Sequence, residues 1–203
     1  MSRTRRRVTD AAALKALAHP TRINLLSVLV TDGPLTASQA AELVGESPSN
    51  CSWHLRRLAE HGFVREVPSD DGRNRPWRAV SEGLEWGEDA DDGTGETVRM
   101  AADALTDVLL DRELGRLRAA RARHDAEPPA WREATGVMQT HAWLTAAEAQ
   151  ETKRRLEELM TAHADRLQDP ESRPPDARLV SLVGWLVPSR PPREDDEPPE
   201  EPR

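Results

Sequence analysis

The 203-residue sequence is poor in cysteine and in aromatic residues, with one Cys, one Phe and no Tyr. The single cysteine, Cys51, excludes an intrachain disulfide and also a zinc finger or ribbon, which needs several thiolates. Glycine-rich phosphate loops, metal-ligand clusters and a Gly-x-Ser-x-Gly elbow are missing too, which argues against an enzyme. No run approaches the roughly 20 apolar residues that cross a bilayer, so we expect a cytoplasmic protein with no membrane partner.

The charge of the chain is unevenly divided. The sequence has 28 basic and 36 acidic residues, and residues 1–80 hold 12 of the basic and 8 of the acidic ones. The N-terminal part is therefore basic inside an acidic chain, which is typical of a phosphate-binding module joined to a solubilising remainder. Lys15 and Lys153 are the only lysines, and this preference for arginine indicates a GC-rich bacterial genome.

Helix signals fill the first 62 residues. Ser47 is a good N-cap, Pro48 suits the first helical position and Gly62 ends the pattern. Gly45 ends the preceding helix, and two helices joined by a short glycine-containing turn have the spacing of a helix-turn-helix. From apolar spacing and capping residues, the predicted helices cover residues 9–18, 21–31, 36–44 and 47–61.

A β-hairpin is predicted directly after the fourth helix. Residues 63–67 and 77–80 alternate apolar and charged side chains, which favours strands. The turn between them contains Asp71 and Gly72, and an Asp-Gly pair in this setting is typical of a hairpin. A hairpin in this position is a wing, so residues 11–86 are predicted to form a winged helix-turn-helix.

The C-terminal half alternates helix and strand signals. A leucine stripe predicts a long helix from residue 96 to about residue 124, and Thr145 and Glu148 form a capping box that opens a further helix. Residues rich in Val and Leu predict strands over 135–144 and 178–187. We expect the later helix to bury Leu156, Leu159, Met160 and Leu167.

The predicted fold class is mainly α with small β (α+β), with a long helix and a small helix and strand domain after the wing. A short acidic stretch with glycines, residues 87–95, separates the two halves. The predicted regions are a flexible basic arm (1–10), the winged helix-turn-helix (11–86), a C-terminal dimerisation or ligand-sensing region (94–188) and a disordered acidic, proline-rich tail (189–203).

The fourth helix carries the candidate function. If Cys51, Leu55 and Leu58 face the core, helical periodicity turns a polar arc outward. Small hydrogen-bonding side chains near a helix N-terminus can reach base edges, while free backbone amides meet phosphate. The alternative is an amphipathic surface helix whose polar residues are simply solvated. The outward residues are Ser49, Asn50, Ser52, Trp53 and Arg56.

Three motifs in combination resemble the ArsR-type winged-helix transcriptional regulators. They are ALAHPTR at residues 16–22, SPSNCSWHLRRLAEHGFV at residues 47–64 and GRNR at residues 72–75. The resemblance covers residues 11–84, and the C-terminal half resembles the extension of some actinobacterial relatives. It implies a homodimer that places two recognition helices in successive major grooves of an inverted-repeat operator in double-stranded DNA.

The resemblance also implies which residues touch DNA. Arg73 and Arg75 of the wing are expected near the backbone or the minor groove. Trp53 departs from the pattern, because its ring can stack or touch a thymine methyl, or pack beside the helix, but cannot make a bidentate base contact. The implied contacts in the recognition helix are Ser47, Ser49, Asn50, Ser52, Trp53 and Arg56.

Many relatives sense metals through a Cys-x-Cys pair on the third helix or through Asp and His clusters. Residues 36–44 contain no cysteine, and the histidines of the C-terminal half, His124, His141 and His163, are isolated, so we expect no metal and no other cofactor. The tryptophans of this half either line a pocket for a small apolar effector or belong to a core or dimer interface. These tryptophans are Trp131, Trp143 and Trp185.

Two residue groups of the N-terminal half have alternative readings. Cys51 is either a redox switch or, as we favour, a buried small hydrophobe, and His54 is expected to be a hydrogen-bonded packing residue. The first arginines form either a minor-groove arm or a solubilising tail. These arginines are Arg3, Arg5, Arg6 and Arg7.

The competing class for the whole chain is a winged-helix protein-interaction adaptor without specific DNA binding.

Overall fold

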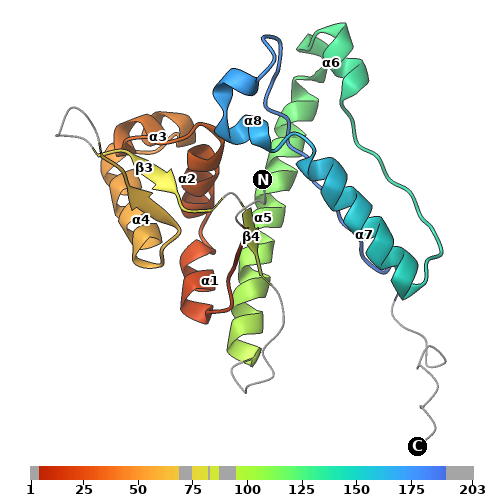
Figure 1. Ribbon diagram of the computed structural model, residues 1–203, viewed down its shortest axis with the longest axis horizontal. Helices are drawn as coiled ribbons and strands as arrows, with labels where there is room; N and C mark the ends of the chain where they lie inside the picture. The colour runs from red at the N-terminus through yellow and green to blue at the C-terminus, as the bar shows by residue number, and fades with distance from the viewer. Residues whose placement is uncertain (1–4, 69–74, 82, 87–94, 191–203) are drawn as a thin grey trace, which may run out of the picture. The chain divides into compact units, whose positions relative to one another are not determined.

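The computed structural model describes residues 5–68, 75–81, 83–86 and 95–190. The chain is mainly helical with a few short strands (Figure 1), as the sequence predicts. No described helix is both long enough and apolar enough to cross a membrane. Contacts divide the chain into two compact units, unit 1 (Met1–Val137 with Asp165–Arg173) and unit 2 (Met138–Ala164 with Pro174–Arg203).

The first four helices are those that the sequence predicts, with small changes at their ends. Asp10, not Thr9, caps the first helix, because its carboxylate accepts a hydrogen bond from the backbone N–H of Ala13 at 2.8 Å. The second helix begins at Pro20, which suits this position because proline has no backbone N–H that would lack a partner there. Its cap is His19 and not Thr21, the first residue of the predicted range. The four helices are α1 (Ala11–Leu17), α2 (Pro20–Thr31), α3 (Ala37–Val44) and α4 (Pro48–Glu60).

The wing is confirmed within the described residues. Strands β2 (Val64–Glu66) and β3 (Trp77–Ala79) pair in antiparallel register. Leu35, just before α3, joins this sheet, because its backbone exchanges two hydrogen bonds with Trp77, at 3.0 and 2.8 Å. The turn of the hairpin, residues 69–74, and the predicted hinge at residues 87–94 lie outside the described residues.

The N-terminal arginines were expected in a flexible arm, but residues 5–8 are ordered. Strand β1 (Arg5–Arg7) pairs in parallel with β4 (Gly83–Glu85), and Val8 is buried in the core. The guanidinium of Arg6 lies over the ring of Phe63, 4.5 Å from its centre. Burial of Val8 and backbone pairing together stabilise this segment against the domain, a long-range effect that local sequence does not reveal.

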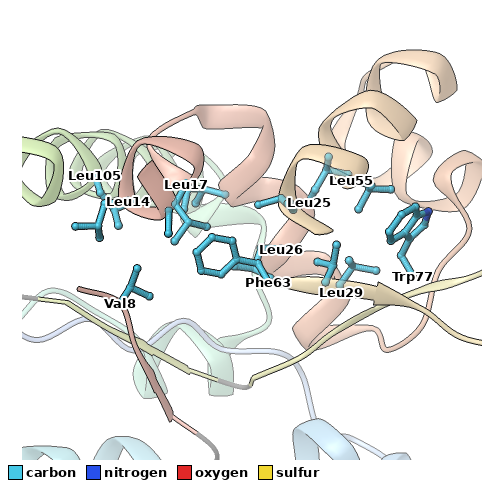
Figure 2. Packing of buried hydrophobic residues seen from close by; sticks show 14 of the residues in the cluster. Val8, Leu14, Leu17, Leu25, Leu26, Leu29, Leu55, Phe63, Trp77 and Leu105 are labelled. Carbon is cyan, nitrogen blue, oxygen red and sulfur yellow. The ribbon is translucent and has the colours of Figure 1, made fainter. Parts of the chain in front are cut away.

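One hydrophobic core holds unit 1 together (Figure 2), and it draws on the first four helices, the wing, the long helix that follows the wing, and Val8, which comes directly after β1. Leu25 and Leu29 come from α2, and Leu55 and Leu58 from α4. Because fully burying one such side chain contributes roughly 1.5–3 kcal/mol, this set fixes how α4 sits on α2. The side chains labelled in Figure 2 are Val8, Leu14, Leu17, Leu25, Leu26, Leu29, Leu55, Phe63, Trp77 and Leu105.

The long helix α5 (Gly95–Ala122) belongs to this core at its beginning. Val98, Ala101 and Leu105 are buried, and the helix packs mainly on α1. Farther along, Nε of Arg112 donates to Oδ1 of Asn24 at 3.0 Å, which joins α5 to α2. Burial, and then the neighbouring Arg116, lower the pKa of Arg112 to about 10.

The two strands predicted in the C-terminal half are wrong. Residues 135–144 and 178–187 form no strand with any described segment. The propensity of such residues for strands depends on a neighbouring strand and a covering layer, and the single chain offers neither. A short helix not foreseen by the sequence, α6 (Pro129–Ala134), follows the 3-10 turn η1 (His124–Ala126) after α5.

The capped helix of unit 2, α7 (Ala146–Thr161), begins as predicted. The side chain of Thr145 accepts from the backbone of Glu148, whose carboxylate accepts from the backbone of Thr145. Its apolar face was expected to be buried, but Leu156, Leu159 and Met160 are exposed, because the segment around Gly184, which approaches Met160, covers little of it. Leu167 in α8 (Asp165–Gln168) is half-buried. The 3-10 turn η2 (Pro170–Ser172) follows α8.

Candidate nucleic-acid interface

The sequence between α3 and α4 sets the direction of α4. Gly45 ends α3 with a left-handed backbone, φ 72° and ψ 34°, which a residue with a Cβ adopts only with strain. Ser47 then caps α4, because its hydroxyl oxygen accepts from the backbone N–H of Asn50 at 3.2 Å. The burial of Cys51 and Leu58 in the core turns the opposite face of α4 outward.

All six recognition-helix residues predicted to touch DNA lie on this outward face. Two of them, Asn50 and Ser52, are half-buried, and the other four, Ser47, Ser49, Trp53 and Arg56, are exposed. Trp53 is 54% exposed, its ring meets the ring of His54 edge-on with ring centres 4.8 Å apart, and it is not part of the core. Nε of Arg56 donates to the backbone carbonyl of Ser52 at 3.2 Å, which holds the guanidinium along the same face.

Glu46 is a residue of this site that the sequence did not single out. One of its carboxylate oxygens accepts from Nδ2 of Asn50 at 2.9 Å, and the other accepts from the hydroxyl of Thr21 at 3.4 Å. It thereby links the start of α2 to the first turn of α4. The sequence signal that could have identified Glu46 is its position, directly after the C-cap glycine Gly45 and directly before the N-cap Ser47.

Two histidines meet beneath the recognition helix. The rings of His19 and His54 lie with their centres 4.6 Å apart. His54 is buried, and among the described residues Nδ1 of His54 has no hydrogen-bond partner, so the expected packing is confirmed but the expected hydrogen bond is wrong for this atom. Burial, then His19 and Arg22, lower the pKa of His54, and burial and then Arg22 lower the pKa of His19.

Cys51 lies on the inner face of α4 and is fully buried. Burial, and then the charge of Glu46, raise the pKa of its thiol. A raised pKa keeps the sulfur protonated and unreactive. The reading of Cys51 as a small buried hydrophobe therefore fits its surroundings better than a redox switch.

The wing carries a second group of cations. Arg65 on β2 and Arg78 on β3 are partners in the strand register, and both are exposed. Like charges directly opposite each other destabilise a strand pair, and neither arginine forms an ion pair with a residue that the structure describes. Nη1 of Arg75 lies 3.5 Å from a carboxylate oxygen of Glu66, and Arg73 lies outside the described residues.

Outside α4 and the wing, the structure brings few candidate groups together. In the described parts of the chain, no three His, Cys, Asp or Glu side chains are grouped so that they could hold a metal ion. Trp131 is half-buried, while Trp143 and Trp185 are exposed in the single chain. The tryptophans therefore do not form a core within one chain.

Comparison with known proteins bears on residues 17–67, which match the family described as a helix-turn-helix domain. No curated protein matches the chain. A solved structure of the heme sensor protein PefR in complex with heme and carbon monoxide aligns with 78% of this chain and 83% of its own, at 16% identity and a TM-score of 0.31, and we draw nothing from so distant a likeness. The chain thus contains a helix-turn-helix domain, α2 to β2, and such a domain indicates a DNA-binding regulator.

Proposed function

We propose that the protein is a sequence-specific DNA-binding transcriptional regulator of ArsR type, which binds an inverted-repeat operator as a homodimer in the bacterial cytoplasm. The observation that carries this proposal is the outward face of α4, where six predicted contact residues are accessible beside a basic wing. A winged helix-turn-helix of this form places such a helix in the major groove.

Base recognition falls to the first turns of α4. Ser47, Ser49 and Asn50 offer donors and acceptors at the helix N-terminus, where free backbone amides also favour a phosphate oxygen. Asn50 can pair bidentately with adenine once its amide leaves Glu46. Arg56, one and a half turns farther on, supplies positive charge to the same groove.

The wing supplies phosphate contacts. The like-charged pair Arg65 and Arg78 has no compensating carboxylate among the described residues, and a phosphate oxygen between the two guanidiniums would relieve their repulsion. Arg73 and Arg75 extend this cationic surface toward the tip of the hairpin. Contacts of this kind position the protein on any duplex and carry no sequence information.

We assign dimerisation and signal sensing to the region of residues 94–188 and propose no enzymatic role. The effector is proposed to be a small apolar molecule, because this region exposes large apolar side chains, including Trp143 and Trp185. A metal is not proposed, since α3 has no cysteine and the histidines are scattered.

Selection of bound duplexes from a random pool, followed by titration of the recovered palindrome at several salt concentrations, tests the proposal. We expect strong preference for one inverted repeat and a log–log salt slope of about −0.9 for each phosphate that the protein neutralises. A matched duplex with one half-site scrambled is the control for dimeric binding. No enrichment, or binding that ignores salt, would favour the protein-interaction adaptor and refute the regulator.

A further inference from the structure

Unit 2 has no hydrophobic core of its own. Among its described residues, 138–164 and 174–190, no side chain is buried. The buried hydrophobic side chains that the structure describes all belong to residues 8–105, in unit 1. Thirteen of the twenty large hydrophobic side chains that the structure leaves exposed lie instead in unit 2.

The last part of unit 2 runs as an extended chain along α7. A Cβ placed on Gly184 would lie 3.6 Å from the sulfur of Met160, at the C-terminal end of α7. The guanidinium of Arg190 lies 5.9 Å from the ring centre of Trp143, just before the N-terminal end of α7. The six residues that follow Gly184, up to Arg190, therefore run between the two ends of this helix, which is about 24 Å long. Six extended residues span about 20–22 Å, so the segment is close to fully extended, and the long side chains of Met160 and Arg190 cover the rest.

This extended segment is apolar on both sides. Successive side chains of an extended chain point in opposite directions. Leu182 and Val183 are neighbours, and they are 58% and 51% exposed. The contact between Gly184 and α7 thus leaves most of the apolar surface of this segment without a covering layer.

We propose that unit 2 is the dimerisation surface, on which residues 179–187 and residues 138–144 dock against the same segments of a second copy of this chain. The inference rests on the homodimer proposed above and states which surface forms it. In a two-fold symmetric pair the same patch is used twice, so the apolar side chains of one copy meet those of the other.

The area of this surface suits a second copy. Aromatic side chains bury about 150–250 Å² each, so Trp143 and Trp185, 86% and 61% exposed, present on the order of 300 Å². The same two segments expose eight further aliphatic and methionine side chains, which brings the apolar surface to the size of a stable interface, roughly 800 Å² per partner. A monomer rarely exposes a patch beyond about 300–600 Å².

The charges of α7 do not oppose such pairing. α7 carries four glutamates against one lysine and two arginines. Arg154 and Arg155 both pair with Glu151, at 2.7 Å, and Arg154 also pairs with Glu158. Because the charges of α7 compensate one another within each copy, two copies meet with little net repulsion.

The test is the oligomeric state of the full chain. We expect the wild-type protein to sediment with twice the mass of one chain, 22.6 kDa, and L182E/W185E to have a dimer Kd raised by at least about tenfold. Both side chains are exposed in the single chain, so the far-ultraviolet circular dichroism of unit 1 should persist. The matched control is Leu43→Glu, at an exposed apolar residue of α3 in unit 1, which should leave the Kd unchanged.

A cysteine crosslink decides the matter even if L182E/W185E folds poorly. The native Cys51 is buried, so a single cysteine introduced by Leu182→Cys is the accessible thiol of each chain. We expect mild oxidation to link two L182C chains and to leave chains with Leu43→Cys, at an exposed residue of α3, single. A monomeric wild type, an unchanged Kd for L182E/W185E, or equal crosslinking of both cysteine variants would overturn the inference.

Failure of this inference is distinguishable from failure of the proposed function. A wild-type dimer that L182E/W185E dissociates, but that selects no duplex, retains the interface and removes the regulator. A protein that binds an inverted repeat as a dimer in both forms retains the regulator and removes the interface. A monomeric wild type would instead leave the apolar surface to a small effector or to another protein.

Discussion

At the scale of single residues, Asn50 stands between two partners. Its amide donates to Glu46 in the free protein, and the proposed base contact needs the same amide. On a random duplex Asn50 exchanges one hydrogen bond for another, so the net change in binding free energy is small. Where an adenine edge replaces the carboxylate, the exchange favours binding. Asn50 is therefore well placed to discriminate between sequences.

For Asn50→Ala we expect a loss of sequence preference by roughly 1–3 kcal/mol at one position of each half-site, with affinity for random duplex nearly unchanged. Competition titrations with operator variants measure both quantities. Glu46→Gln, which keeps the shape of the carboxylate but weakens its hold on Asn50, serves as the control and should retain the preference. Equal discrimination by Asn50→Ala and wild type would remove Asn50 from the contacts.

The pair formed by buried His54 and half-buried His19 makes stability depend on pH. The pKa values of His54 and His19 are both lowered from 6.5 by burial and by neighbouring cations. The unfolded chain therefore binds protons that the folded chain rejects, so their contribution to stability is complete above about pH 6.5 and is lost as pH falls through the folded pKa values.

We predict that His54→Gln loses part of this pH dependence. Urea unfolding at pH 7.5 and pH 5.5 should show a smaller decrease in the free energy of unfolding for the variant than for the wild type. His124→Gln, at an exposed histidine in η1, is the control. A decrease in His54→Gln as large as in the wild type would show that the pair does not govern acid sensitivity.

At the scale of elements, local signals were sufficient where they alone decide the structure. Ser47, Pro48 and Gly45 place α4, and the alternating residues of β2 and β3 form the wing, because caps and turns act within a few residues. The outward face of α4 followed from periodicity alone. The sequence did not reveal β1, because its pairing with β4 joins residues distant in the chain. Glu46 was not singled out, because its contact with Thr21 is also distant in sequence.

The strands expected in unit 2 failed for a related reason. Residues 178–187 have the composition of a buried strand, but a strand forms only beside another edge. The sequence correctly indicated that this segment needs a covering layer, but it did not identify that layer. The same reasoning applies to the apolar face of α7.

The wing offers a prediction in which stability and function change in opposite directions. Replacing both Arg65 and Arg78 by alanine removes a like-charged cross-strand pair, so we expect the free protein to be more stable by about 0.2–1 kcal/mol while DNA affinity decreases. Thermal unfolding and DNA titration test the two effects. A variant that is less stable and binds DNA as well as the wild type would refute the phosphate assignment.

We predict that the first part of α5 contributes to the free energy of unfolding of the DNA-binding domain. Leu105 is fully buried and Met100, on the same helix, is exposed. Leu105→Ala should lower the free energy of unfolding by about 2–5 kcal/mol, whereas Met100→Ala should change it by less than about 0.5 kcal/mol. Similar small effects in urea unfolding would mean that α5 contributes little to unit 1.

At the scale of the whole molecule, the charge is sorted by function. The chain is acidic overall, with a formal net charge of −8, yet residues 1–80, which hold α4 and the wing, carry 12 basic against 8 acidic residues. An acidic remainder discourages nonspecific association with nucleic acid. Affinity for DNA then depends on a small number of arginines.

The double variant R73A/R75A tests this dependence. We expect affinity to fall for all duplexes alike and the log–log salt slope to become shallower by about one for each phosphate that the variant no longer neutralises. Titrations of operator and random duplexes at several salt concentrations measure the slope. An unaltered slope would show that the tip of the wing does not reach the DNA.

The absence of buried side chains from the described residues of unit 2 in a single chain bears on the life of the protein in the cell. A segment that buries no side chain in a single chain adds nothing to the free energy of folding until a second molecule binds it. Its stability therefore rises with the concentration of the protein. Newly made chains at low copy number would present an open apolar surface to proteases, and accumulated chains would be protected. The abundance of such a regulator would then rise steeply once its concentration is high enough for two chains to meet and dimerise.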